Sequence, residues 1–239
     1  MAFFWTETWS ALGAVLFPAS CVSCRNLALA HDPPLCGRCW DRLPRFASPL
    51  CSCGTPLPGS GGESCGRCRR GLSVIARGAS LGPYEGVLRD CVISLKYRGR
   101  HRTARGLAAR LFADHECRSV LADADGLVGV PLHRDRENER GFNQAHLIAQ
   151  SLSIAATVPL AGTLVRVRDT PSQTTLDARA RRRNVRGAFV VPRSAGVAGS
   201  VLVLIDDVTT TGATVRECAR TLLAAGAREV RAIVVARAE

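Results

Sequence analysis

The chain contains almost no lysine and lacks a long uninterrupted hydrophobic run. Lys96 is the only lysine, although Lys and Arg together number 32, so arginine carries nearly all the positive charge. The apolar segment over residues 2–20 is short, includes Glu7, is interrupted by Pro18 and has no basic leader. This pattern excludes a membrane span and a secretion signal. We expect an amphipathic helix over residues 1–20 that packs on its own protein rather than on a membrane surface, and a cytoplasmic protein.

Length and charge limit the classes of protein to consider. The chain has 239 residues, of which 46% are hydrophobic, enough for one full α/β domain and a small appendage. The formal net charge is +12 and the sequence pI is about 9.8. Such an excess favours phosphate-rich partners, either a diphosphate substrate or a nucleic acid backbone, and it does not distinguish between the two.

Eight of the eleven cysteines occur as close pairs near the amino terminus. Two such pairs can surround one tetrahedral Zn²⁺, so the segment predicts two structural zinc sites. Only the third pair has one intervening residue instead of two, which departs from the usual pattern. A redox or disulfide cluster and an iron–sulfur cluster are the alternatives. We interpret the remaining Cys91, Cys117 and Cys218 as buried apolar residues. The predicted ligands are Cys21, Cys24, Cys36, Cys39, Cys51, Cys53, Cys65 and Cys68.

The segment over residues 201–214 reads VLVLIDDVTTTGAT. Its apolar, β-branched start is typical of a buried parallel strand, and open α/β sheets bind ligands at the carboxyl ends of such strands. Asp206 and Asp207 follow directly. The next residues form a turn whose backbone N–H groups and hydroxyls suit a phosphate at the start of a helix. The alternative is an ordinary strand, turn and helix in which the two acids only cap the helix. The turn residues are Val208, Thr209, Thr210, Thr211, Gly212, Ala213 and Thr214.

Apolar periodicity elsewhere predicts alternating strands and helices, and hence a mostly parallel sheet flanked by helices. Asn143 is the expected N-cap of the helix that begins at residue 144. A charged loop is expected before it, over residues 131–145. The other expected elements are strands over 72–81, 126–130 and 230–235, and helices over 85–96 and 103–121.

Residues 201–214 resemble the phosphoribosyltransferase signature, which holds 5-phosphoribosyl 1-diphosphate (PRPP). The resemblance implies that Asp206 and Asp207 are the catalytic acids and contact the ribose 2- and 3-hydroxyls. It also implies that residues 208–214 bind the 5-phosphate. The expected reaction is Mg²⁺-dependent ribosyl transfer, in which a nucleophile attacks C1 of PRPP as diphosphate leaves.

The cysteine segment resembles the double zinc ribbon of ComF-type proteins, and several later motifs resemble the same family. The resemblance implies a zinc-ribbon domain over residues 21–70 and a type I phosphoribosyltransferase-like domain over 71–239. Lys96 would act as a point charge near phosphate or the acceptor, although a lone lysine is commonly solvated. Arg136 and Arg140 would add charge near the diphosphate, although this run also has the pattern of a solvated loop. The residues placed beside the diphosphate are Pro131, Leu132, His133 and Arg134.

A third segment, over residues 168–189, also matches the ComF pattern. Three interpretations are open: a mobile loop that closes over the reacting centre, a basic surface helix, or a nucleic acid contact. The expected partners are PRPP, single-stranded DNA and competence-machinery proteins. The sequence therefore supports two functions, ribosyl transfer to an unknown acceptor linked to DNA uptake, or non-catalytic binding of single-stranded DNA on a retained PRPP fold. Polar residues of this segment include Thr170, Ser172, Gln173, Arg179, Arg181, Arg182, Arg183 and Asn184.

Overall fold

The structure is a computed structural model of the whole chain. It describes residues 20–26, 35–46, 48–57, 64–97, 101–168, 183–193 and 195–238. The helix expected over residues 1–20 lies outside the described residues except for Ser20. Most of the segment over residues 168–189 also lies outside them.

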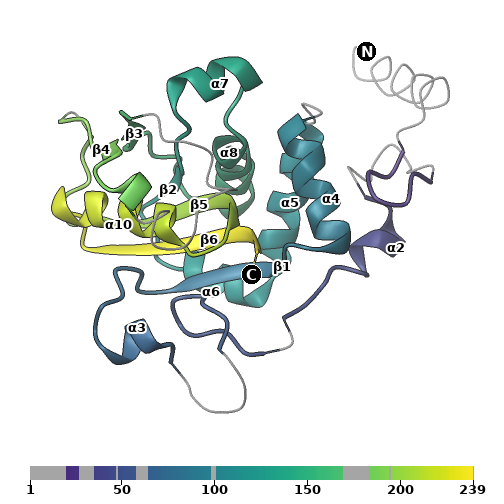
Figure 1. Cartoon of the computed structure of the whole chain (residues 1–239), viewed down its shortest axis with the longest axis horizontal. Coiled ribbons are helices and arrows are strands. Elements are labelled where there is room, and N and C mark those ends of the chain that lie inside the picture. The colour runs from purple at the N-terminus through teal and green to yellow at the C-terminus, as the bar shows by residue number, and fades with distance from the viewer. Residues whose placement is uncertain are drawn as a thin grey trace, which may run out of the picture.

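A four-stranded parallel sheet organises the chain (Figure 1). Strand β5 pairs with β6 on one side and with β2 on the other, and β1 follows β6. Seven consecutive residues of β5 are buried, as its apolar sequence predicts for a strand covered on both faces. The α/β prediction with a parallel sheet is confirmed. The strands are β1 (Gly78–Pro83), β6 (Glu229–Arg237), β5 (Val201–Thr209) and β2 (Gly126–Gly129).

Two hydrophobic cores cover the two faces of the sheet. Alternate residues of β5 point to opposite faces, so Val203 and Ile205 join one core while Leu202 and Leu204 join the other. The second core also contains the buried face of α10 (Ala213–Ala224) and Phe189 of β4 (Phe189–Val190), a short strand that pairs antiparallel with β3 (Val165–Arg166). The helices of the first core are α4 (Gly86–Tyr97), α5 (His101–Ala113), α6 (His115–Leu121) and α8 (Gln144–Ala156).

Three predicted elements differ from the structure. The helix expected over residues 103–121 is two helices, because the Asp114 side chain accepts a hydrogen bond from Cys117 N at 3.0 Å and caps a new helix. The charged loop contains helix α7 (Arg134–Arg140), which His133 caps and Gly141 ends with φ at 80°. The first strand begins at Gly78 rather than residue 72, since the preceding residues continue the turns of the cysteine segment.

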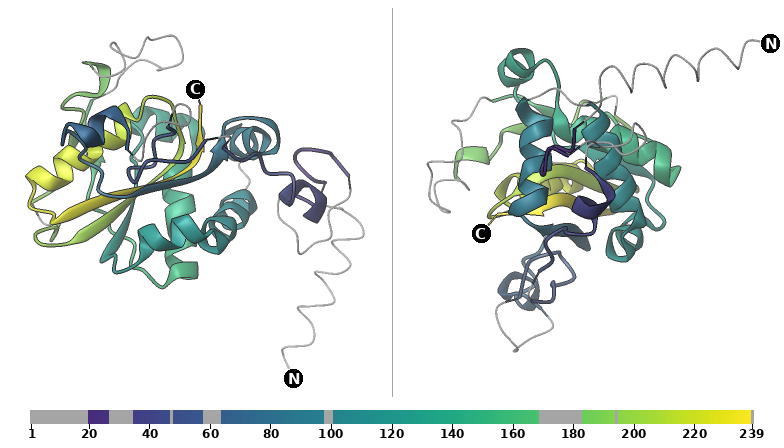
Figure 2. Two further views of the ribbon diagram at one scale, coloured as in Figure 1. Left: turned by 90° about the horizontal axis from the view of Figure 1, so that it is seen from below. Right: turned by 90° about the vertical axis from the view of Figure 1, so that its right-hand side faces the viewer.

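The two cysteine ribbons dock at separate places on the sheet domain (Figures 1 and 2). The first contains α2 (Gly37–Trp40) and lies beside α4, where Ser23 Oγ donates to Asp90 Oδ2 at 2.7 Å. The second contains α3 (Gly66–Arg69) and packs into the core on the α10 face. Its backbone touches the start of β1, because a Cβ on Gly78 would lie 2.5 Å from the carbonyl oxygen of Cys53. Each ribbon is therefore attached to a different face of the sheet.

The helices in the described part of the chain are too short or too polar to span a membrane.

Candidate active site and metal centres

The two acids lie within strand β5 rather than after it. The strand continues to Thr209, and Asp206 pairs in register with Val234 of β6. Adjacent strand residues face opposite sides, so Asp207 shares the α4 face with Ile205 while Asp206 points to the α10 face. Their exposed fractions are 8% for Asp206 and 4% for Asp207. Two neighbouring carboxylates this deeply buried need donors or a cation to offset their desolvation.

Lys96 supplies one cation. It lies in the last turn of α4, and its Nζ is 2.6 Å from Asp207 Oδ2. Burial lowers the pKa of Lys96, but the charges of Asp207 and Asp206 outweigh burial and hold its pKa above the ordinary value. The only lysine of the chain is therefore a charged member of the acid cluster and not a solvated side chain.

Among the described residues, Asp206 has no cation as close as Lys96 is to Asp207. Burial, followed by the charge of Asp207, raises the pKa of the Asp206 carboxyl well above its usual range. Its Oδ1 accepts a hydrogen bond from Asp207 N at 2.9 Å. A carboxyl group in this state is ready to interact with a hydroxyl donor or a bound cation, since either would relieve the cost of its burial.

The turn between β5 and α10 has the shape of an anion site. Gly212 is the N-cap of α10 with φ at 67°, a left-handed conformation that favours glycine. A Cβ there would lie 2.6 Å from Arg216 Nη1, and Arg216 Nη2 donates to the carbonyl of Thr211 at 2.5 Å. Thr211 Oγ1 is buried without a hydrogen-bond partner among the described residues. The first turn of a helix also presents backbone N–H groups that suit a phosphate.

The loop after β2 lies at the same edge of the sheet, because β2 is the parallel neighbour of β5. Val130 N donates to the carbonyl of Ile205 at 2.9 Å, which fixes the start of this loop next to the acids. Asn143 holds it from the other side: its Nδ2 donates to the carbonyl of Val130 and its Oδ1 accepts from Ala145 N. The N-cap prediction for Asn143 is confirmed. Directly after Val130 in the chain come the residues predicted beside the diphosphate, Pro131, Leu132, His133 and Arg134.

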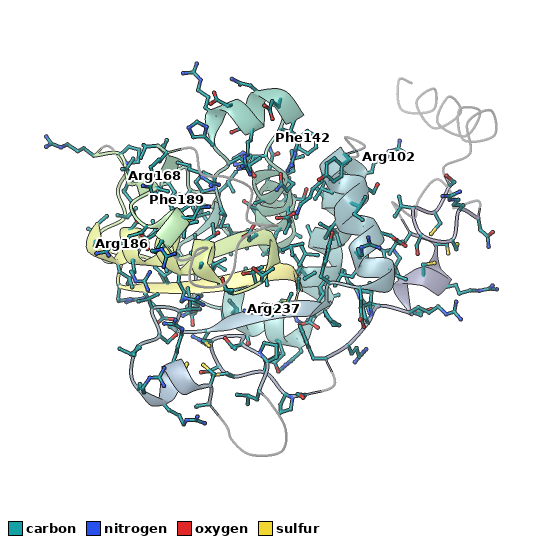
Figure 3. The ribbon with its side chains drawn as sticks, viewed as in Figure 1. Arg102, Phe142, Arg168, Arg186, Phe189 and Arg237 are labelled. Atoms are coloured by element: carbon teal, nitrogen blue, oxygen red, sulfur yellow. The ribbon has the colours of Figure 1, made fainter. Side chains whose placement is uncertain are left out.

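Lys96 and Arg140 border one cavity of about 590 Å³. Arg140 Nη1 donates to Gln144 Oε1 at 2.7 Å, and its guanidinium lies 5.9 Å from the centre of the Tyr97 ring. The cavity thus joins the end of α4 to α7, with Phe142 between them (Figure 3). Of the residues predicted near the phosphates, Lys96, Arg136 and Arg140 line this cavity, whereas the run from Pro131 to Arg134 does not.

The eight paired cysteines form two clusters of four, as the sequence predicts. Within each cluster the sulfur atoms all lie within 4.8 Å of one another. The sulfurs of Cys24 and Cys36 are 3.7 Å apart, as are those of Cys53 and Cys65. A tetrahedral zinc with Zn–S bonds of about 2.3 Å separates its sulfurs by about 3.8 Å, whereas a disulfide requires about 2.05 Å. All these cysteines are free thiols, so the disulfide alternative is wrong and the thiols fit structural zinc.

The environments of the thiols differ within each cluster. Burial raises the pKa of Cys21 and of Cys51, but backbone N–H groups outweigh burial and bring the pKa of each to about 6. Burial and the neighbouring thiols raise the pKa of Cys39 and of Cys68 to about 12. Zinc binds thiolates, so loading each cluster at neutral pH must release protons.

Three arginines near the turn were not singled out by the sequence analysis. Arg216 lies one helical turn after Gly212, a spacing that could have indicated it. Arg67 lies between two cysteines of the second ribbon, and Arg237 ends β6 opposite Thr209. No local pattern relates these last two, because they meet only when the ribbon docks on the sheet.

The fold and the cysteine clusters together define a phosphoribosyltransferase-type domain that carries a double zinc ribbon. Residues 12–69 match the double zinc ribbon domain, and residues 139–239 match the phosphoribosyl transferase domain. The chain belongs to the ComF family. It is 36% identical over 219 residues to the DNA utilization protein YhgH of Salmonella typhi, covering 90% of this chain and 95% of that protein.

More distant relatives resemble the chain over most of its length. Competence protein F of Haemophilus influenzae is 31% identical and covers 93% of this chain and 98% of its own length. Competence protein ComFC of Bacillus subtilis is 27% identical, and the alignment covers 83% of this chain and 81% of that protein. The glutamine PRPP amidotransferase from B. subtilis aligns with a TM-score of 0.40 and 22% identity over 60% of this chain and 30% of that structure. The present chain therefore spans less than a third of that enzyme.

Proposed function

We propose that this protein binds PRPP with Mg²⁺ at the carboxyl edge of its sheet and transfers the phosphoribosyl group to an acceptor. The observation that carries the proposal is the buried pair Asp206 and Asp207, braced by Lys96 and followed at once by the Gly212 turn. The buried acids suit the hydroxyl groups at one end of a ribose 5-phosphate, because buried carboxylates need donors. The turn suits the phosphate at the other end.

Each part of the site has a role in this proposal. Asp206 and Asp207 accept hydrogen bonds from the ribose hydroxyls, and Thr209, Thr210, Thr211, Gly212, Ala213 and Thr214 surround the 5-phosphate. The loop after β2 lies beside the diphosphate. Bound Mg²⁺ would supply positive charge to the leaving diphosphate. Within the ribbon domain that we assign to residues 21–70, the second ribbon packs on the α10 face of the domain over 71–239 and supports the turn from that side.

The transfer itself needs no covalent intermediate on the protein. A lone pair of the acceptor forms a bond to C1 as the bond from C1 to the diphosphate oxygen breaks, and the electron pair of that bond leaves with diphosphate. A proton lost by the acceptor passes to solvent. The protein contributes orientation and charge: Lys96 offsets the acid pair, and the fixed N–H groups of the turn hold the phosphate end.

Calorimetric titration of the purified, zinc-loaded protein with PRPP and Mg²⁺ tests binding. Incubation with PRPP, Mg²⁺ and a panel of nucleobases, followed by measurement of released diphosphate, tests transfer. Saturable binding with acceptor-dependent diphosphate release supports the proposal, and the absence of PRPP binding overturns it.

A second candidate function is the binding of single-stranded DNA, in a cytoplasmic setting with competence-machinery partners. Relatives named for DNA utilization and competence favour it. So does a cavity of about 410 Å³ beside α10 that is lined by Arg183, Arg186, Arg216 and Arg220, with Glu217 as its acidic residue. Glu217 already pairs with Arg220 at 2.9 Å. Binding of a labelled oligonucleotide that falls steeply with salt supports this function, and no binding at low salt overturns it.

A further inference from the structure

The second ribbon is joined to the edge of the sheet through its backbone. Gly78 N, at the start of β1, donates to the carbonyl of Ser52 at 2.7 Å, and Cys53 forms a parallel bridge with Gly78. Strand β1 lies at one edge of the described sheet, so the ribbon extends the sheet there. The approach is close, since a Cβ on Gly54 would lie 2.8 Å from the carbonyl carbon of Gly78. These contacts fix the second cysteine cluster to the sheet that carries the acid pair.

The second ribbon also packs against the Gly212 turn. A cavity of only about 30 Å³ remains between them, and its wall includes Cys53 and Thr55 of the ribbon and Thr209 and Gly212 of the turn. Cys65 lines the neighbouring cavity at the same turn. None of the described cysteines of the first cluster lines either cavity. Of the two clusters, it is therefore the second that lies against the turn.

Arg237 connects the second cluster with the start of the turn. It ends β6 in register with Thr209, and Ala238 N donates to the carbonyl of Thr209 at 2.9 Å. Burial lowers the pKa of Arg237, and the charges of Cys53 and Cys65 oppose this lowering, so the guanidinium lies within reach of the cluster. A Zn²⁺ bound by four thiolates carries a net charge of about −2, which attracts a neighbouring guanidinium. A metal-loaded cluster therefore favours the position of Arg237 beside the turn.

We infer that metal binding at the second cluster holds the Gly212 turn in its ligand-binding shape, with Arg237 as the positioning residue between them. The ribbon is too small to keep its fold without the metal, so metal loss removes the packing that covers the turn. Such coupling is reciprocal, and a ligand at the turn must also hold the metal more tightly. That ligand is PRPP, so the reciprocal effect rests on the proposed function, whereas the effect of the metal on the turn does not.

Hydrogen exchange of the full-length, zinc-loaded protein, followed by mass spectrometry, tests the effect of the metal on the turn. Cys51→Ser with Cys53→Ser should speed amide exchange over residues 208–216 at least about fivefold. Cys21→Ser with Cys24→Ser is the matched control, because it removes two ligands from the first cluster and should leave exchange at the turn unchanged. Elemental analysis checks that each variant retains one zinc ion. Unchanged exchange in the second-cluster variant, or equal acceleration in both variants, would overturn the inference.

Variants of Arg237 test its role with every cysteine in place. Arg237→Gln should keep both zinc ions and still speed exchange at the turn, because the charge beside the cluster is lost. Arg237→Lys should restore most of the protection, since it keeps a positive charge there. Arg228→Gln makes the same change of charge at an exposed residue directly before β6 and should have no effect. If Arg237→Lys protects the turn no better than Arg237→Gln, charge does not link the cluster to the turn and the role of Arg237 is wrong.

Zinc release to a chelator tests the reciprocal effect of PRPP. The two cysteine-pair variants show which part of the wild-type release belongs to each cluster. PRPP with Mg²⁺ should slow release from the second cluster at least about fivefold and change release from the first cluster much less. Calorimetry measures PRPP binding to the same samples. Binding without slower release, or equal slowing at both clusters, would overturn the inference and leave the proposed function intact. Absence of PRPP binding would overturn the proposed function, and exchange at the turn would still decide the inference.

Discussion

Lys96 Nζ lies 2.6 Å from Asp207 Oδ2, and this contact joins the end of α4 to the central strand β5. The Lys96 side chain is 22% exposed and that of Asp207 is 5% exposed, so the pair is largely removed from water. Asp206, the preceding residue, faces the other side of the strand and has no such cation in the part of the chain that the structure describes. The two adjacent acids therefore have different electrostatic states, and several measurable consequences follow from this difference.

Substitution of the two acids should change stability in opposite directions. Asp206→Asn should raise the free energy of unfolding by about 1 kcal/mol or more near neutral pH, because it removes a buried charge and keeps an oxygen acceptor for Asp207 N. Asp207→Asn should lower it by about 2 kcal/mol, because Lys96 is left buried without its partner. Urea unfolding of both variants measures this, and changes of the same sign would contradict the account.

The Asp206→Asn gain should depend on pH. The folded-state pKa of Asp206 lies above the ordinary value of 3.8, so the folded state binds the proton more tightly than the unfolded state. The resulting stability is present below pH 3.8 and is lost as pH rises through the folded-state pKa. The variant should therefore exceed the wild type in free energy of unfolding most at alkaline pH, and the two should be equally stable at acid pH. A gain that does not change with pH would point to packing instead of charge.

Lys96 and Asp207 should show energetic coupling in a double-mutant cycle. Lys96→Met and Asp207→Asn each leave one buried partner unpaired, whereas the double variant leaves neither. We expect the double variant to be more stable than the sum of the single effects predicts, by about 1–3 kcal/mol. Lys96→Met with Asp90→Asn on the same helix is the control cycle, because Asp90 contacts Ser23 instead. Additive effects in both cycles would show that the ion pair contributes nothing measurable.

The purified protein should contain two zinc ions per chain, one for each cysteine cluster. Cys51→Ser with Cys53→Ser should reduce the zinc content to one and loosen the second ribbon, since the thiolates hold the metal on which its fold depends. Elemental analysis measures the metal, and Cys91→Ser is the control because this cysteine lies outside both clusters. If the wild type contains one zinc ion per chain and the Cys51 and Cys53 variant contains the same amount, the second zinc site is ruled out.

The sequence predicted the parts of this molecule that depend on local patterns. The strand β5, the turn at Gly212 and helix α10 follow one another within a short stretch, and each cysteine pair is a local feature. The break at Asp114 was missed because the side-chain cap interrupts a helical pattern that otherwise continues. The contact of Lys96 with Asp207 and the meeting of Arg67 with Arg237 join distant segments, and only the packing of the helices and ribbons brings them together.

PRPP affinity of the acid-pair variant tests the central claim most directly. Calorimetric titration with PRPP and Mg²⁺ should show binding to the wild type that weakens at least about tenfold, or about 1.4 kcal/mol, in Asp206→Asn with Asp207→Asn. Asp41→Asn with Asp123→Asn makes the same change of charge at exposed positions and should bind as the wild type does. Equal PRPP affinity in a folded acid-pair variant and in the wild type would contradict the assignment of these acids to the ribose.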